Sequence, residues 1–243
     1  MISKELLITS NSRGLLVGPE ENEESFAKRC CGTSPSPNSA LAHTERLFGI
    51  SPDWISVLYS NQGLLPWVGG AVTIEEERFT LQVRKAFRQK ERYLWLYSRE
   101  EILSHEFVHG ARLAFDEPLF EEILAYQTSK SKFRRFWGPI FRSSKESFLF
   151  LLSLPFLYIP WGLPLTLGVM TFFLFRLLKY QKIFSQALVR LKEVVGDKAL
   201  ACALRLTDKE IILFSRSFPD QIIAYASTSK SLRWKQITSV YFS

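Results

Sequence analysis

Ser98-Arg-Glu-Glu-Ile-Leu-Ser-His-Glu-Phe-Val-His109 is the stretch of this chain that decides the fold. Ser98 and Glu101 have the spacing of a capping box, in which each side chain satisfies a free backbone amide at the start of a helix. We therefore expect a helix over residues 99–115. A proline at position 118 predicts its end, because the residue before a proline is biased away from helix.

Two histidines on this helix predict a metal site. His105 and His109 are four residues apart, so both imidazoles project from one face and can bind a single metal ion. Glu106 lies beside them and can act on a water molecule bound to that metal. The other face is apolar and is expected to pack on a sheet; it carries Leu103, Phe107, Ala111 and Ala114.

The segments before this helix predict the sheet. β-Branched residues and apolar–polar alternation indicate strands at residues 67–74, 79–83 and 93–97. The acidic residues 75–77 are expected to turn the chain between the first two strands. Short helices are expected at residues 40–48 and 52–59.

A catalytic zinc needs a third protein ligand besides the two histidines. After the turn at residues 116–118, a second helix over residues 118–130 should run back toward the metal. It reaches the level of the metal after four to six residues, at Glu121 or Glu122. The third histidine, His43, lies in no ligand pattern, and we interpret it as a surface or core residue.

Residues 105–109 form an HExxH motif, and the sequence Glu122-Ile-Leu-Ala125 follows it. This pair of motifs resembles the zinc metallopeptidases of the gluzincin type. In that family a helix after the HExxH helix carries a glutamate ligand, often with a small residue three positions later. Glu122 with Ala125 fits this pattern better than Glu121 with Leu124. The resemblance covers residues 93–126 and, more loosely, the strands from residue 67.

The resemblance implies a zincin-like domain with one zinc ion per chain, bound by His105, His109 and Glu122. It also implies that Glu106 is the general base. The chain departs from the family in two ways. The spacing between the second histidine and the glutamate is short, and Tyr126 stands where an aspartate would directly follow the small residue.

A second hypothesis for the third zinc ligand stays open. Membrane-embedded gluzincins insert apolar helices between the HExxH motif and an ExxAD-like motif. Here Glu193-Val-Val-Gly196-Asp197 follows an apolar segment in that order. Glu193 is therefore an alternative to Glu122, as is Glu121.

The expected reaction also needs a place for the substrate and for the developing negative charge. An edge strand containing Gly69, Gly70 and Ala71 could pair with an extended peptide and hold it across the metal. Tyr126 or Tyr97 is a candidate donor to the oxyanion.

Residues 147–175 carry no charged side chain, and this uncharged run is long enough for a membrane span. Prolines and a glycine around residues 160–164 predict a turn, so the segment is either one kinked span or a hairpin over residues 147–178. Basic residues precede and follow the segment: Lys130, Lys132, Arg134, Arg135, Arg142, Lys145, Arg176, Lys179, Lys182, Arg190 and Lys192. The positive-inside rule then favours a hairpin that enters the membrane from the cytoplasmic side.

The composition of the chain indicates the kind of binding partner and the cellular compartment. The chain of 243 residues has a formal net charge of +7, which suits an anionic lipid surface, and it shows no base-stacking module for nucleic acid. Three cysteines, Cys30, Cys31 and Cys202, do not form a disulfide framework and indicate a reducing compartment. The N-terminus lacks the unbroken apolar run of a signal peptide.

Four regions are expected along the chain. Residues 1–39 should be weakly structured, residues 40–146 should form the zincin-like domain, residues 147–178 the apolar hairpin or span, and residues 179–243 a helical region. In the last region, helices are expected at residues 183–195, 197–206, 208–214, 219–226 and 232–241.

The sequence therefore predicts an α+β protein with a small, mostly antiparallel sheet, an HExxH helix and a membrane hairpin. The expected function is that of a membrane-associated zinc-dependent metallopeptidase acting on a peptide or protein substrate. The alternatives are a catalytically inert zinc-binding membrane protein and a membrane scaffold with a coincidental motif.

Overall fold

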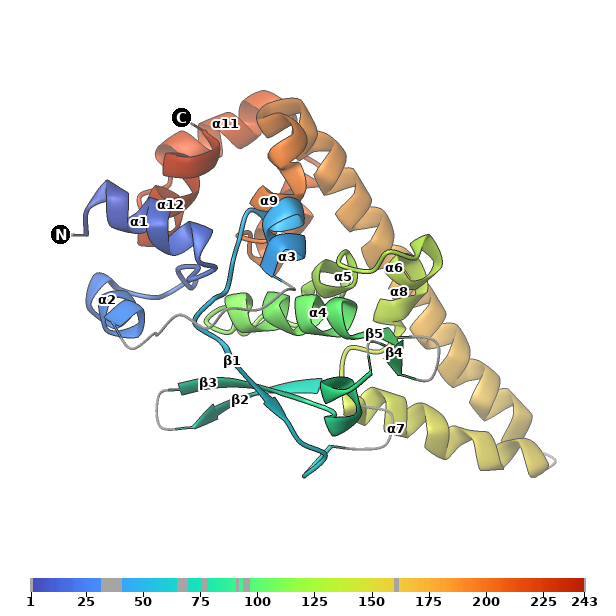
Figure 1. Cartoon of the computed structure of the whole chain (residues 1–243). Helices are drawn as coiled ribbons and strands as arrows, with labels where there is room; N and C mark the ends of the chain where they lie inside the picture. The colour runs from blue at the N-terminus through green and yellow to red at the C-terminus, as the bar shows by residue number, and fades with distance from the viewer. Residues whose placement is uncertain are drawn as a thin grey trace.

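The computed structural model describes residues 2–31, 41–64, 70–75, 78–90, 92–93, 97–159 and 162–242. In this part of the chain the protein is mostly helical, with a small sheet and one long apolar helix (Figure 1). The α+β class expected from the sequence is thereby confirmed.

The main sheet has three strands in the order β1-β3-β2. Strand β1 (Ser56–Tyr59) runs parallel to β3 (Arg78–Val83), and β2 (Gly70–Glu75) runs antiparallel to β3. The sheet is thus mixed, and the prediction of a mostly antiparallel sheet is not supported. The prediction of a helix over residues 52–59 is wrong, because long-range pairing with β3 outweighs the local preference of this segment.

The predicted strand over residues 93–97 is replaced by a small hairpin. Strands β4 (Arg92–Tyr93) and β5 (Tyr97–Ser98) pair antiparallel with each other. A short 3-10 helix, η1 (Lys85–Arg88), connects β3 to this hairpin. The predicted strand over residues 67–74 is described only from Gly70 onward, and the predicted turn at 75–77 lies largely outside the described residues.

Helix α4 (Arg99–Arg112) carries the HExxH motif and lies between the sheet and the helices above it (Figure 1). The predicted capping box is present in part: the Ser98 hydroxyl accepts the amide of Glu101 at 3.2 Å, whereas the Glu101 carboxylate accepts from Arg134. The helix ends three residues before the predicted residue 115. Leu103 and Phe107 pack toward the sheet, as expected. Ala111, however, packs with the C-terminal helices, and the predicted sheet-facing stripe is wrong at this position.

The segment after α4 forms short helices. The predicted helix over residues 118–130 is limited to α5 (Glu121–Tyr126), because the chain from Asp116 to Phe120 forms turns. Helices α6 (Lys132–Trp137) and η2 (Gly138–Ile140) follow. Helix α3 (Leu41–Phe48), close to the predicted 40–48, packs against α4 from the side opposite the sheet.

The apolar segment folds as a helical hairpin that projects from the body (Figure 1). Its first arm is α7 (Ser144–Ser153) with η3 (Leu154–Tyr158), and its second arm is the start of α8 (Gly162–Val195). Inside the hairpin, the Thr166 hydroxyl donates to the carbonyl of Ser153 at 2.8 Å. Helix α8 is continuous, so the separate helix predicted over residues 183–195 is its second half.

The C-terminal part of the chain is helical, as predicted. Its elements are η4 (Gly196–Lys198), α9 (Ala199–Ala203), α10 (Asp208–Phe214), α11 (Pro219–Thr228) and α12 (Leu232–Tyr241). The predicted capping box of Thr207 and Glu210 is present at the start of α10. These helices share one hydrophobic core with α4, α5 and the second half of α8, and therefore support the HExxH helix directly.

The N-terminal segment is better ordered than predicted. It forms α1 (Lys4–Ser12) and α2 (Glu23–Cys31), and α1 packs beside α12 (Figure 1). The buried amide group of Gln236 accepts from the amide of Val17 and donates to the carbonyls of Leu7 and Leu15. The prediction of weak structure is wrong, because the stabilising partner lies at the other end of the sequence. The predicted linker at residues 32–39 lies outside the described residues.

One close backbone approach fixes the end of α4. A methyl group at Gly18 would lie 2.5 Å from the backbone carbonyl oxygen of Ala114, which cannot move without shifting the turn that directly follows this helix. We expect Gly18→Ala to lower the free energy of unfolding by about 1–3 kcal/mol, measured by thermal or denaturant unfolding in detergent. Gly168→Ala on the hairpin is the matched control, since its methyl group meets no described atom within 4 Å. Equal stability of the two variants would contradict the packing described.

Candidate metal centre

Helix α4 places the two histidines of the motif side by side. The Nε2 atoms of His105 and His109 lie 3.2 Å apart, and both side chains are partly exposed. The four-residue spacing on one helical face explains this, as expected from the sequence. The two nitrogens can therefore bind the same ion.

Helix α5 supplies a carboxylate to the same point. Glu122 Oε2 lies 3.5 Å from His105 Nε2, and Glu122 Oε1 lies 3.5 Å from His109 Nε2. Ligand atoms of these three residues all fall within 4.8 Å of one another. The structure thus brings together the three residues that the sequence singled out as ligands.

The spacing of these atoms fits the coordination geometry of zinc. Nitrogen and oxygen ligands at about 2.0–2.1 Å from a tetrahedral zinc ion lie about 3.3–3.4 Å from one another. The separations of 3.2, 3.5 and 3.5 Å are close to that value. Two imidazoles and one carboxylate are also the donor set of several catalytic zinc sites, in which the fourth position is open to water.

The other candidate ligands take different roles. Glu193 lies on α8, where its exposed side chain pairs with Arg190 at 3.4 Å. His43 is buried and its Nε2 donates to the carbonyl of Thr128 at 2.8 Å, which agrees with its interpretation as a core residue. Neither residue belongs to the cluster around His105.

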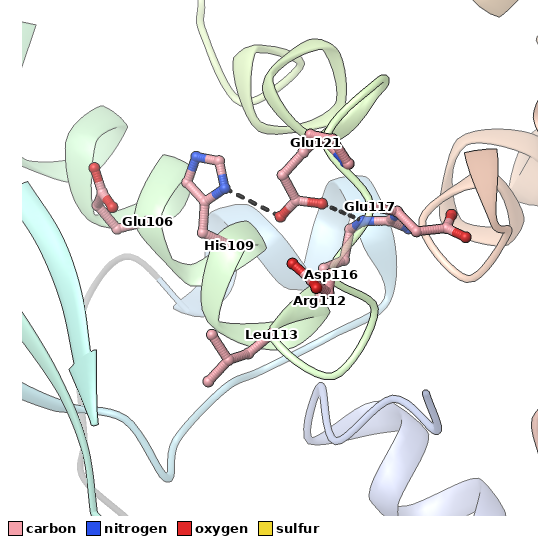
Figure 2. A pocket seen from close by; sticks show the side chains of 8 residues that line it. Glu106, His109, Arg112, Leu113, Asp116, Glu117 and Glu121 are labelled. Atoms are coloured by element: carbon pink, nitrogen blue, oxygen red, sulfur yellow. Dashed lines mark hydrogen bonds and ion pairs between the residues drawn. The ribbon is translucent and has the colours of Figure 1, made fainter. Parts of the chain in front are cut away.

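Glu121 lies behind the cluster and orients one of its histidines. It accepts from His109 Nδ1 at 3.1 Å (Figure 2) and from Arg112 Nε at 2.6 Å. Because Glu121 holds a proton on Nδ1, the second proton of His109 leaves from Nε2, and the Nε2 lone pair is then free to bind a metal. From the sequence, Glu121 is expected only as an alternative ligand; its contact with His109 is an additional role.

Arg112 holds this arrangement from inside the protein. Its side chain is fully buried, and its Nη1 donates to the carbonyls of Leu204 and Leu206 at 2.6 and 3.0 Å. Arg112 is not among the residues predicted from the sequence. Its only signal in the sequence is its position three residues after His109, on the same helical face.

The charges of the cluster reinforce one another. Burial acts to lower the pKa of His109, but the carboxylates of Glu122 and Glu121 outweigh it and raise that pKa to about 10. Burial acts to raise the pKa of Glu122 and Glu121, and the neighbouring positive charges, chiefly His109 and Arg112 respectively, hold both pKa values below their usual range. Two anionic carboxylates therefore face the histidines.

Glu106 lies between the histidines and strand β2. A methyl group at Gly70 would lie 3.3 Å from the Glu106 Cγ atom, so this glutamate lies directly against the strand. On the other side, Glu106 and His109 line a cavity of about 350 Å³ (Figure 2). The remaining lining residues are Arg112, Leu113, Asp116, Glu117, Pro118 and Glu121.

The predicted oxyanion donors are only partly described. The ring of Tyr126 lies edge-on to His105, with 4.7 Å between the centroids. Gly138 leaves room for this ring, because a methyl group there would lie 2.2 Å from a Tyr126 ring carbon. The structure thus gives Tyr126 a packing role beside His105, and its role as a donor stays a prediction. The side chain of Tyr97 and the residue Gly69 lie outside the described part.

Comparisons of the chain with protein-family models, with curated proteins and with solved structures give no significant match. The function therefore has to be argued from the site itself.

The raised pKa of His109 predicts how metal binding depends on pH. With a pKa of about 10, His109 is protonated at neutral pH in the metal-free protein. Zinc binds the unprotonated imidazole, so its uptake must release this proton, and the affinity should fall about tenfold for each pH unit below that pKa. Calorimetric zinc titrations in buffers of different protonation enthalpy should show at least one proton released per zinc. Binding without proton release would contradict the described charge state.

Proposed function

We propose that this protein is a membrane-attached zinc-dependent peptidase. The observation that carries the proposal is the spacing of the His105, His109 and Glu122 ligand atoms, which suits a tetrahedral zinc ion. A zinc ion bound there would lower the pKa of a water molecule and polarise a carbonyl group.

Glu106 is the proposed general base. It follows His105 on α4, and it lines the cavity together with His109. In the proposed reaction its carboxylate takes a proton from the attacking water and passes it to the leaving amine. Neither Glu121 nor Glu122 is free for this role, since the first is bound to Arg112 and the second faces both histidines.

Strand β2 supports a peptide as the substrate. Among the described residues it forms one of the two edges of the three-stranded sheet, and Gly70 lies against Glu106. A substrate that paired with this edge in an extended conformation would lie next to the general base. The HExxH helix packed on a sheet with such an edge strand, followed by a glutamate-bearing helix, is the arrangement that we interpret as zincin-like.

The hairpin supports the membrane attachment. Helix α8 is the only helix of the described residues that is long and apolar enough to cross a bilayer. Only 22% of its most apolar stretch of 18 residues is buried inside the protein. The exposed side chains of the hairpin include Phe148, Leu152, Leu163, Leu167 and Phe175. A helix of a soluble core would be mostly buried, so a lipid environment explains this surface better.

The length and charge of the hairpin favour entry from one face. The uncharged part of α8 before Arg176 has a length of about 21 Å, less than the roughly 30 Å of a bilayer core. At the base of the hairpin, Arg176 binds Glu146 through two hydrogen bonds of 2.5 and 2.6 Å. Basic residues flank both arms, and this favours the cytoplasmic face of the membrane.

Replacing Glu106 tests the proposed chemistry. We expect Glu106→Gln to keep its zinc and to lose peptide hydrolysis by about 10²–10⁴-fold, because only the proton transfer is removed. The assay is the appearance of new peptide termini from a complex mixture of peptides, with purified protein reconstituted in vesicles. Glu45→Gln, at an exposed glutamate of α3, is the matched control and should hydrolyse like the wild type.

The control and the metal content separate the alternatives. Zinc bound with no hydrolysis in the wild type would indicate an inert zinc-binding membrane protein. A wild type that binds no zinc would indicate a membrane scaffold. Hydrolysis that survives in Glu106→Gln would contradict the role of this glutamate.

A further inference from the structure

Helix α6 exposes a patch of aromatic side chains between the metal centre and the hairpin. None of its six residues is buried, and Phe133, Phe136 and Trp137 are 69%, 38% and 39% exposed. Their rings contact one another, with centroid separations of 6.1 Å for Phe133 and Trp137 and 5.4 Å for Phe136 and Trp137. We call these three residues the aromatic patch. Such a contiguous exposed patch indicates a binding surface.

The aromatic patch is held in place by the body of the protein. Arg134 Nη1 donates to Glu101 Oε2 at 2.8 Å, which joins α6 to the first turn of α4. Gln181 of α8 donates to the carbonyls of Arg135 and Phe136 at 3.2 and 2.9 Å. The exposure of the patch is therefore a property of the folded chain and not of a frayed end.

Its position along α8 matches the level of lipid headgroups. Gln181 lies five residues beyond Arg176, or about 7.5 Å further from the tip of the hairpin. Arg176 and Glu146 mark the base of the apolar arms. With the arms in the hydrocarbon core, α6 would lie in the interfacial layer just above it (Figure 1).

The charges around the patch suit an anionic surface. Lys132 and Arg135 alternate with the aromatic residues on α6, and Lys179 and Lys182 follow on the neighbouring stretch of α8. Tryptophan concentrates at membrane interfaces because its ring joins an apolar body to a polar N–H group. Helices that lie in the interface also carry phenylalanine on the face that enters the membrane and basic residues on the other. Basic residues near the surface add attraction to anionic headgroups.

We propose that α6 is a membrane-interface helix, whose aromatic patch lies among the headgroups of the leaflet that holds the hairpin. The partner is an anionic phospholipid surface, and the contact is continuous with the hairpin. The inference rests on the membrane attachment in the proposed function. It adds a second contact that fixes the orientation of the metal centre, because α6 is joined to α4 one turn before His105.

The test compares three exposed phenylalanines. Phe133 of α6, Phe172 of the hairpin and Phe218 before α11 are 69%, 60% and 64% exposed, so each can be replaced by cysteine and labelled with an environment-sensitive fluorophore. Cys30 and Cys31 are first replaced by alanine. Cys202 can remain, since it is fully buried and burial raises the pKa of its thiol to about 12.

The full-length variants are reconstituted in vesicles of phosphatidylcholine and phosphatidylglycerol that contain lipids with a nitroxide at the headgroup or along the acyl chain. We expect the Phe133→Cys label to be quenched by headgroup nitroxides and the Phe172→Cys label by acyl-chain nitroxides. The Phe218→Cys label should keep its fluorescence with both.

The three labels separate the possible failures. Quenching at Phe172→Cys without quenching at Phe133→Cys would overturn the inference and leave the membrane attachment intact. No quenching at any label would overturn both the inference and the proposed attachment. Equal quenching at Phe133→Cys and Phe218→Cys would also overturn the inference, since it would show that the α6 contact is not specific.

Discussion

The buried guanidinium of Arg112 joins the parts of the protein on which the candidate site depends. It belongs to the last turn of the HExxH helix, binds Glu121 of the ligand-bearing helix α5, and donates to the carbonyls of Leu204 and Leu206. Its Cζ atom also lies 4.4 Å from the ring centre of Phe115. Loss of one partner of a buried pair costs about 3–5 kcal/mol, so these contacts fix α4, α5 and the C-terminal helices relative to one another.

These contacts of Arg112 also position the side chains of the candidate metal centre. Glu121 is held by Arg112 and in turn holds His109, while the adjacent Glu122 faces the two histidines. In the proposed zinc site, the two neighbouring glutamates would therefore have different tasks: Glu121 would orient His109, and Glu122 would bind the metal. The C-terminal helices contribute no ligand to the described cluster, yet the turn between α9 and α10 supplies the carbonyl groups that place Arg112.

The long helix α8 connects this site to the proposed membrane anchor. Its first half forms the hairpin, and its second half, through Phe184, Ala187 and Leu191, belongs to the core that supports α4 and α5. A single continuous helix transmits position better than two helices joined by a loop. The hairpin and the candidate site are therefore parts of one packed structure.

Local patterns predicted the parts of the structure that depend on near neighbours in the chain. The capping residue Ser98, the histidine spacing on α4 and the capping box at Thr207 all act within one helical turn, and each is present. Strand β1 was predicted as a helix, because its identity comes from pairing with β3 more than twenty residues away. The N-terminal helices were missed for the same reason, since their partner Gln236 lies near the other end of the chain.

The same distinction between local and long-range contacts applies to the residues of the candidate site. The length of α4 and the turn after it predicted Glu121 or Glu122 as the third ligand, and the resemblance to gluzincins favoured Glu122. The contact of Glu121 with His109 could not be predicted, because it depends on the side chain of Arg112. That side chain is positioned by carbonyls some ninety residues later in the chain. No local pattern encodes such a contact.

The most direct test of this account is the zinc content of detergent-purified protein, compared with that of Glu122→Ala and Glu193→Ala. The account predicts one zinc per chain in the wild type and in Glu193→Ala, and loss of zinc in Glu122→Ala. A wild type that binds no zinc even after refilling, or a loss of zinc in Glu193→Ala with retention in Glu122→Ala, would contradict it.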